Sequence, residues 1–127
     1  MATSGTYLLS GLWPPYAEAV RYLLAWADYY NLQSTIVSGY RSLDEQARLY
    51  AKGRTQYEIQ QRVRKHGGGG SVTDAPPGSS AHNYGLAVDF EGPDQRAVIS
   101  LARQIGFGLI SWDPGHVEYP GWQSLIR

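Results

Sequence analysis

The sequence contains no cysteine among its 127 residues. This absence excludes disulfide bonds, a thiolate metal site and a cysteine nucleophile, so any metal site must use histidine, aspartate or glutamate. An excess of either charge is also missing, because 11 lysine and arginine residues balance 11 aspartate and glutamate residues. A neutral chain is unlike nucleic-acid binders, which usually carry a basic face, and it has no electrostatic attraction to an anionic membrane.

Long apolar runs are missing as well. The longest apolar-rich stretch, residues 17–30, is interrupted by Glu18, Arg21 and Asp28, so we expect no membrane-spanning segment. The first 16 residues do not combine a basic start with a sustained apolar stretch, and we expect no secretory signal peptide. The length fits one hydrophobic core, and we therefore predict a single domain over residues 1–127.

Apolar periodicity and turn residues predict the order of the secondary structure elements. Helices are expected at residues 14–30, 42–53, 55–66 and 93–104, and strands at 34–38, 86–90, 107–112 and 116–119. Asn31 is a candidate left-handed stop for the first helix, and Ser42 and Thr55 are candidate capping residues. The four glycines 67–70 predict a flexible loop. Helices precede most strands, which favours an α+β fold: a short antiparallel sheet flanked by helices.

Three histidines are the first candidates for chemistry: His66, His82 and His116. His66 ends a basic segment, and a cation at a helix C-terminus is stabilised by the helix dipole, so we do not assign it as a ligand. Asp89 lies at the end of an apolar predicted strand, where a carboxylate requires a partner such as a metal cation or an arginine.

Two histidines and an aspartate are sufficient for a catalytic zinc site, which takes three nitrogen or oxygen ligands and leaves a position for water. Such a site also needs a general base nearby. Asp113 lies three residues before His116, with Pro-Gly between them, and we expect a tight turn at 113–115 to bring both side chains together. This spacing alone is a weak signal, since the pattern is common by chance.

The segment SAHNYGLAVD at residues 80–89 matches the S-x-H-x-x-G-x-A-x-D pattern of the zinc D-Ala-D-Ala carboxypeptidases and dipeptidases and their phage relatives. Asp113-x-x-His116 resembles the second motif of that family, and SGYRS at 38–42 resembles its upstream element. EQARLYAKGRT at 45–55 and HNYG within the first motif are more similar to the L-alanyl-D-glutamate endopeptidases of phage endolysins. The resemblance extends from about residue 34 to residue 119, and the motifs follow one another in the same order as in the family.

This resemblance implies a role for each matching residue. The three zinc ligands would be His82, Asp89 and His116, and Asp113 would be the base that takes a proton from the attacking water and later protonates the leaving amine. Arg41 would steady the substrate carbonyl and its developing negative charge. Ser80 would contact the substrate, and Tyr84 is expected only to contact the site. The alternative for Arg41 is a solvated or ion-paired arginine after a strand, for example one paired with Asp44 or Glu45.

The resemblance predicts a zinc-dependent peptidase that cleaves peptidoglycan stem peptides, with the L-Ala–D-Glu bond favoured by the phage-like motifs. D-Ala-D-Ala or D,D/L,D-carboxypeptidase activity is the close alternative, and a non-enzymatic, virion-associated wall-binding module is the alternative of another class. A structural site would need neither Asp113 nor Arg41, which favours the enzyme. We expect a monomer that binds neither nucleic acid nor membrane. It would act from the host cytoplasm with holin-dependent access to the wall, or within a virion.

Overall fold

The computed structural model describes residues 2–62, 64 and 73–126. The strands are β1 (Thr3–Ser4), β2 (Ser34–Ser38), β3 (Ala87–Glu91), β4 (Gly108–Ile110) and β5 (Asp113–Glu118). The α-helices are α1 (Pro14–Tyr29), α2 (Leu43–Ala51), α3 (Gln56–Gln60) and α4 (Gln95–Ile105). Three 3₁₀-helices, η1 (Thr6–Gly11), η2 (Ala81–Tyr84) and η3 (Trp122–Ile126), complete the described elements.

The strands form one sheet in the order β1-β2-β3-β5-β4. Strand β1 pairs in parallel with β2, whereas β2–β3, β3–β5 and β5–β4 are antiparallel pairs. The α+β prediction is confirmed, but the sheet is mixed and not purely antiparallel. The additional strand is only two residues long, and therefore gives no periodic pattern by which the sequence could have predicted it.

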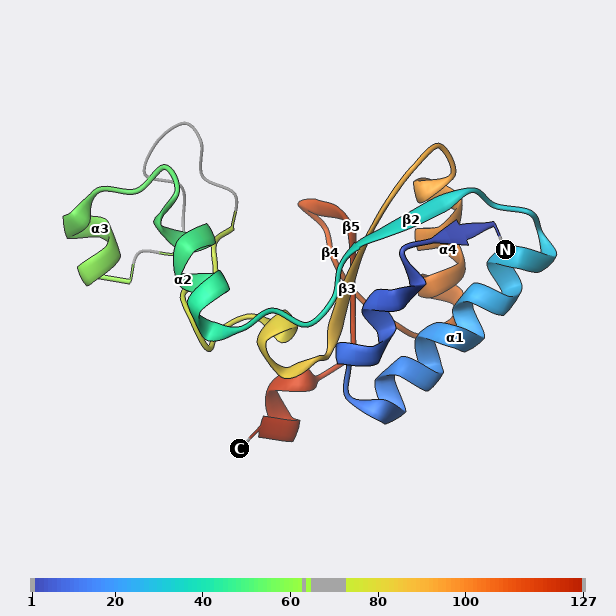
Figure 1. Cartoon of the computed structure of the whole chain (residues 1–127), viewed down its shortest axis with the longest axis horizontal. Coiled ribbons are helices and arrows are strands. Elements are labelled where there is room, and N and C mark those ends of the chain that lie inside the picture. Colours follow the sequence, from blue (N-terminus) through green and yellow to red (C-terminus); the bar gives the residue numbers. More distant parts are fainter. Residues whose placement is uncertain (1, 63, 65–72, 127) are drawn as a thin grey trace.

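Helix α1 supplies much of the hydrophobic core. Pro14 and Pro15 begin it, where their missing amide protons cost nothing, and Asn31 follows its end with a φ of 53°. Its buried face contacts α4 and belongs to the same hydrophobic cluster as apolar residues of β3 and β5, and Figure 1 shows α1 and α4 at the same end of the molecule. The members of this core include Val20, Leu23, Leu24, Ala27, Val88, Phe90, Val98 and Val117.

Leu23 provides a test of this core because its side chain is fully buried in α1. We expect Leu23→Ala to lower the free energy of unfolding by about 2–5 kcal/mol, since the change removes apolar contacts and leaves a cavity. The matched control is Tyr22→Ala, whose side chain is 57% exposed on the same helix, with an expected change within about 0.5 kcal/mol. Urea unfolding followed by circular dichroism measures both; equal effects would contradict this assignment of the core.

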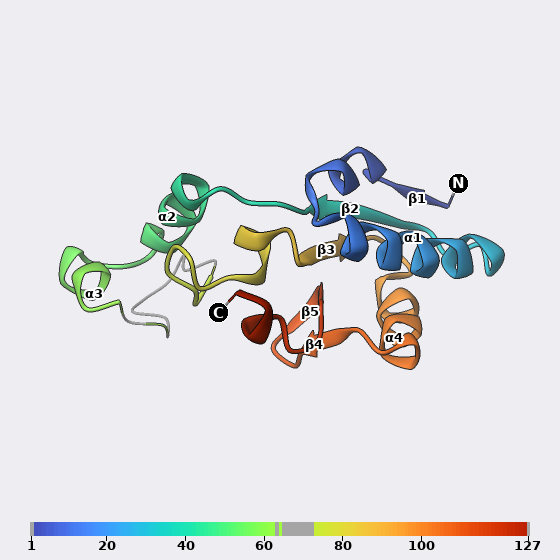
Figure 2. The same cartoon turned by 90° about the horizontal axis from the view of Figure 1, so that it is seen from below.

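Helices α2 and α3 lie away from α1 and α4, at the opposite end of the molecule in both views (Figures 1 and 2). Helix α3 has the capping box predicted from Thr55 and Glu58. It ends at Gln60 and not near residue 66, because Arg62 has a left-handed φ of 54° that does not continue a helix. His66 and the glycines 67–70 lie outside the described residues. None of the helices in the described part of the chain is long and apolar enough to cross a membrane.

The two faces of the sheet have different chemistry because side chains alternate along each strand. Cross-strand register pairs Val88 with Val117 and Asp89 with His116. The first pair is part of the hydrophobic core. The second pair therefore lies on the opposite face of the sheet, which carries the polar residues of the candidate site. The predicted strand at 86–90 is thus confirmed with a shift of one residue, and its alternation fixes the direction of Asp89.

Candidate metal centre

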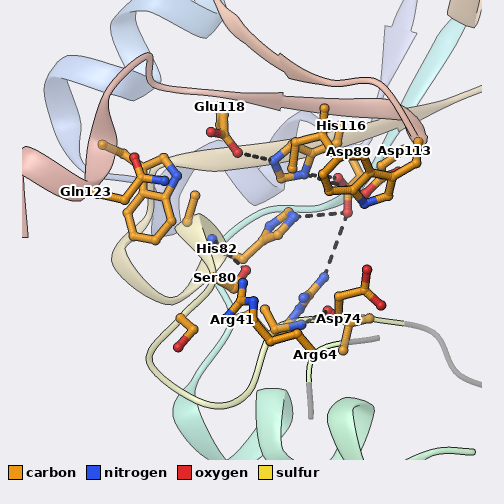
Figure 3. A pocket seen from close by; sticks show the side chains of 17 residues that line it. Arg41, Arg64, Asp74, Ser80, His82, Asp89, Asp113, His116, Glu118 and Gln123 are labelled. Carbon is orange, nitrogen blue, oxygen red and sulfur yellow. Dashed lines mark hydrogen bonds and ion pairs between the residues drawn. The ribbon is translucent and has the colours of Figure 1, made fainter. Parts of the chain in front are cut away.

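Three predicted ligands lie together on this polar face. Figure 3 shows the side chains of His82, Asp89 and His116 converging on one another. The carboxylate of Asp89 has one oxygen 3.1 Å from His82 Nε2 and the other 3.0 Å from His116 Nδ1. One ligand atom from each residue lies within 4.8 Å of the others. Ligand atoms of a tetrahedral zinc site with bonds of about 2.0–2.1 Å are ~3.3 Å apart, so these three residues fit zinc with small adjustments.

The second nitrogen of each histidine has an oxygen partner outside this group. His82 Nδ1 lies 2.8 Å from the backbone oxygen of Gly39, and His116 Nε2 lies 2.7 Å from Glu118 Oε1. An N–H at each of these positions donates to the oxygen, and the other nitrogen of each ring faces Asp89, on the side where a metal cation would bind. Metal-binding histidines commonly have such partners, which fix the tautomer and the ring orientation.

His82 is positioned by η2, and η2 is tied to the segment that follows β2. The side chain of Ser80 caps η2 by accepting from the backbone N–H of His82. The Arg41 backbone N–H donates to the His82 carbonyl at 2.9 Å, and the side-chain amide of Asn83 donates to the Arg41 carbonyl at 2.9 Å. These contacts bring the motif at 80–89 next to the motif at 38–42, although neither motif reveals this contact in the sequence.

Glu118 was missed by the sequence reasoning. It lies two residues after His116 on β5, so both side chains are on the same face of the sheet, and its own side chain is only 15% exposed. The glycine at position 108 leaves room for it, because a Cβ there would lie 3.1 Å from Glu118 Cγ. Its position two residues after His116 in a predicted strand was the sequence signal that could have placed Glu118 on the same face.

The charges at the centre are strongly coupled. Burial raises the pKa of Asp89, but hydrogen bonds with His116 and His82 outweigh it and hold this pKa well below its usual range. Burial lowers the pKa of His116, whereas the hydrogen bonds to Asp89 and Glu118 raise it to about 9. The carboxylate is therefore ionised and available as a ligand. Binding of a metal cation must displace the proton of His116 Nδ1.

Asp113 lies beside this centre, with its Oδ2 3.9 Å from His116 Nδ1. Burial, together with the negative charge of Asp89, raises the pKa of the Asp113 carboxyl above its ordinary value. The predicted turn at 113–115 is wrong, because these residues begin β5 and the chain turns before them. Gly115 permits this strand: a Cβ at that position would lie 2.3 Å from the Phe90 oxygen.

Arg41 is held rigidly at the same centre. Its Nη1 donates to the side-chain oxygen of Gln46 at 2.8 Å and its Nη2 donates to Ser38 Oγ at 3.1 Å, while Nη2 lies 3.8 Å from Asp89. Among the described residues the acidic partner of Arg41 is Asp89 and not Asp44 or Glu45, and the arginine side chain is largely buried and not solvated. Gln46 is fully buried on α2 and donates to the Ala75 carbonyl at 2.7 Å, so it links Arg41 to the far wall of the pocket.

All six predicted site residues line one cavity of about 520 Å³: Arg41, Ser80, His82, Asp89, Asp113 and His116. Further lining residues that the sequence did not predict include Arg64, Asp74, Trp112, Glu118 and Trp122. The Trp112 side chain is 75% exposed at the rim. Tyr84 is not among the lining residues, but it stacks on the lining residue Trp122 and donates to the Gly78 carbonyl at 2.7 Å.

Glu118 can be tested through metal affinity. We expect Glu118→Ala to weaken zinc binding by about 10–100-fold, because His116 Nε2 loses the partner that fixes its tautomer. Glu118→Gln keeps an oxygen acceptor and is expected to lose less. Competition against a fluorescent zinc chelator measures the affinity. The matched control is Glu91→Ala, an exposed residue of β3, and an equal loss in this variant would contradict the role of Glu118.

A site with Asp89 and His116 on the β-sheet, His82 on η2 and a neighbouring acid and arginine has the composition of a mononuclear metallohydrolase site. Residues 10–120 match the family described as VanY, D-alanyl-D-alanine carboxypeptidase. The chain therefore belongs to the VanY family.

Similar proteins include the peptidoglycan L-alanyl-D-glutamate endopeptidase CwlK of Bacillus subtilis (strain 168). It is 37% identical over 94 residues, which are 74% of this chain but only 41% of the relative. Among solved structures, VanYB in complex with D-alanine-D-alanine has a TM-score of 0.56 at 22% identity, covering 89% of this chain and 72% of that one. The LD-carboxypeptidase LdcB has a TM-score of 0.54 at 24% identity, covering 91% and 69%. These two likenesses show the fold.

Proposed function

We propose that this chain is a zinc-dependent peptidase that hydrolyses the stem peptides of peptidoglycan at the bond between L-Ala and D-Glu. The observation that carries the proposal is the convergence of His82, Asp89 and His116 in one cavity with Asp113 and Arg41. Membership of the VanY family and the 37% identity to an L-alanyl-D-glutamate endopeptidase support the substrate class and the bond.

In this proposal His82, Asp89 and His116 would hold the zinc ion. A bound zinc ion would act as a Lewis acid toward the scissile carbonyl and would lower the pKa of water toward ~7. Asp113 takes a proton from the attacking water at a carboxylate oxygen and returns it to the nitrogen of the leaving D-Glu. Its raised pKa makes it a stronger base than an ordinary aspartate, which suits proton transfer near neutral pH.

Arg41 and Ser80 would act on the substrate itself. The guanidinium of Arg41 has five N–H donors, and the two contacts to Gln46 and Ser38 leave others for the carbonyl oxygen of the substrate. Because it is already held in place, Arg41 stabilises the developing negative charge without having to be ordered during the reaction. Ser80 faces the same cavity and is a candidate hydrogen-bonding partner of the stem peptide.

The experiment is digestion of purified peptidoglycan with the zinc-loaded chain, followed by mass spectrometry of the fragments. A new amino-terminal D-Glu, or its amide, that is absent from a chelator-treated sample would support the endopeptidase. Release of free D-Ala would assign the chain to the carboxypeptidase alternative, which the family description favours. No cleavage of several wall types would favour the non-enzymatic wall-binding alternative.

The phage origin belongs to the same proposal and is supported by the motif likeness to endolysins at residues 45–55 and 82–85. A holin-released lysin would act on the wall from inside the cell, and a virion component would act from outside. Addition of the zinc-loaded chain to intact cells and to permeabilised cells, with turbidity as the readout, distinguishes the two. Lysis only after permeabilisation would favour a holin-released lysin, lysis of intact cells would favour a virion component, and no lysis in either case would oppose a lytic role.

A further inference from the structure

The leaving group of the proposed reaction carries a negative charge next to the scissile bond. In a stem peptide D-Glu continues through its γ-carboxyl group, so its α-carboxylate stays on the carbon that bears the scissile nitrogen. The D-Ala released by a carboxypeptidase has a carboxylate at the same place. Only that carbon and the nitrogen separate this carboxylate from the reacting carbonyl carbon. It must therefore lie inside the cavity that holds His82, Asp89 and His116.

This cavity is rich in carboxylates, so a substrate carboxylate that lies beside the proposed metal site and not on it would need a cationic side chain next to it. Four carboxylates line it: Asp74, Asp89, Asp113 and Glu118. Among the described lining residues the cations besides the histidines are Arg41 and Arg64. Arg41 is engaged by Gln46, Ser38 and Asp89. Within the described part of the chain, no acidic side chain forms an ion pair with Arg64.

Arg64 is attached to the wall of the cavity through a buried arginine. Its backbone oxygen accepts from Arg54 Nη2 at 2.8 Å. The Arg54 side chain is 0% exposed, donates to the Tyr50 carbonyl at 2.7 Å and lies 3.8 Å from Asp74. Figure 3 shows Arg64 on the side of the cavity that carries Arg41 and Asp74, across from His116 and Glu118. A substrate bound between these two sides would have its reacting carbonyl at the metal centre and its leaving group within reach of Arg64.

We propose that Arg64 binds the carboxylate on the carbon next to the scissile nitrogen, and that this contact selects stem peptides with a free D-Glu α-carboxylate over those with an amide. The inference rests on the proposed function. A guanidinium is suited to this task because it pairs with a carboxylate through two parallel hydrogen bonds, and a carboxamide offers only one oxygen and no charge. Arg64 is thereby a specificity residue and takes no part in proton transfer.

The test uses two synthetic peptides, L-Ala-γ-D-Glu-L-Lys and the same peptide with an α-carboxamide on D-Glu. For the zinc-loaded chain we expect kcat/KM to be about 10-fold or more higher for the carboxylate, as a charge-assisted pair implies. Arg64→Gln should bring the ratio close to one by a loss on the carboxylate peptide alone. Arg64→Lys should keep part of the preference. The zinc content of each variant, measured by plasma mass spectrometry, should be unchanged.

The matched control is Arg96→Gln, on α4, which lines the neighbouring cavity that touches Asp113 and His116 but not His82 or Asp89. The ratio of kcat/KM for the carboxylate peptide to kcat/KM for the carboxamide peptide should be the same in this variant as in the parent chain. An unchanged preference for the carboxylate peptide in Arg64→Gln, or a loss of this preference in Arg96→Gln, would overturn the inference. Equal cleavage of both peptides by the parent chain would also overturn it while leaving the proposed function intact. Cleavage of neither peptide at full zinc content would overturn both.

Discussion

Replacement of His82 by alanine is expected to abolish zinc binding and peptidoglycan cleavage together. In the proposed site His82 is one of the three residues that would hold the metal ion among the described residues, and η2 offers no other histidine. The metal centre with two remaining ligands would lose affinity by several orders of magnitude, and cleavage would fall to the level of the chelated parent chain. Plasma mass spectrometry of the dialysed protein measures the zinc, and fragment analysis measures the cleavage.

The matched control is the same change at His66, which we do not assign as a ligand. His66→Ala should keep one zinc ion per chain and the activity of the parent. Because His82 also packs among buried residues, circular dichroism should show that the variant folds, and His82→Gln offers a less disruptive second variant. Full zinc occupancy in a folded His82 variant would show that the ligand assignment is mistaken.

Zinc binding is also expected to raise the melting temperature of the parent chain, and metal removal should lower it again. His82 and Asp89 come from the neighbouring elements η2 and β3, whereas His116 comes from β5, which is distant in sequence and pairs with β3 in the fold. A ligand that binds only the folded arrangement stabilises it by mass action. The His82 variant should therefore no longer show the increase in melting temperature that excess zinc produces in the parent, whereas the His66 variant should.

Local sequence patterns correctly predicted the helices and strands that have a regular apolar pattern or a clear terminating residue. Helix α1 has a regular apolar face and Asn31 as its stop, and both appear in the structure. Strand β3 was predicted as an apolar strand with Asp89 near its end, and its alternation places Asp89 on the face opposite Val88. The site residues were predicted by motif resemblance and not by spacing alone. Two histidines and an aspartate along a chain do not specify whether they meet.

Tertiary contacts decided what the sequence left unpredicted. The residues Asp113, Pro114 and Gly115 have the composition of a turn, yet they lie in β5 because Gly115 permits a close approach to Phe90. Gln46 is a polar residue on a helix, and nothing local indicates that it is buried against Arg41. Arg64 has no motif, and its place at the cavity depends on the buried side chain of Arg54. Partners of this kind are specified by the assembled fold.

Replacement of Asp113 by asparagine is expected to separate metal binding from turnover. The asparagine keeps the size of the side chain but has no carboxylate to accept the proton of the attacking water. General acid–base groups contribute about 10²–10⁴-fold to rate, and we expect kcat to fall by about that factor. Zinc content and the KM for the stem peptide should stay close to the values of the parent, because the three ligands and Arg41 are untouched.

Asp44→Asn is the matched control, since Asp44 is an exposed aspartate at the start of α2, and its kcat should equal that of the parent. The two variants differ only in where the carboxylate is lost, so a fall confined to Asp113→Asn identifies a local chemical role. A folded, zinc-loaded Asp113→Asn with full kcat would show that another residue is the base. Glu118, whose Oε1 lies 2.7 Å from His116 Nε2, would then be the next candidate. Loss of zinc in Asp113→Asn would instead make Asp113 a part of the metal centre.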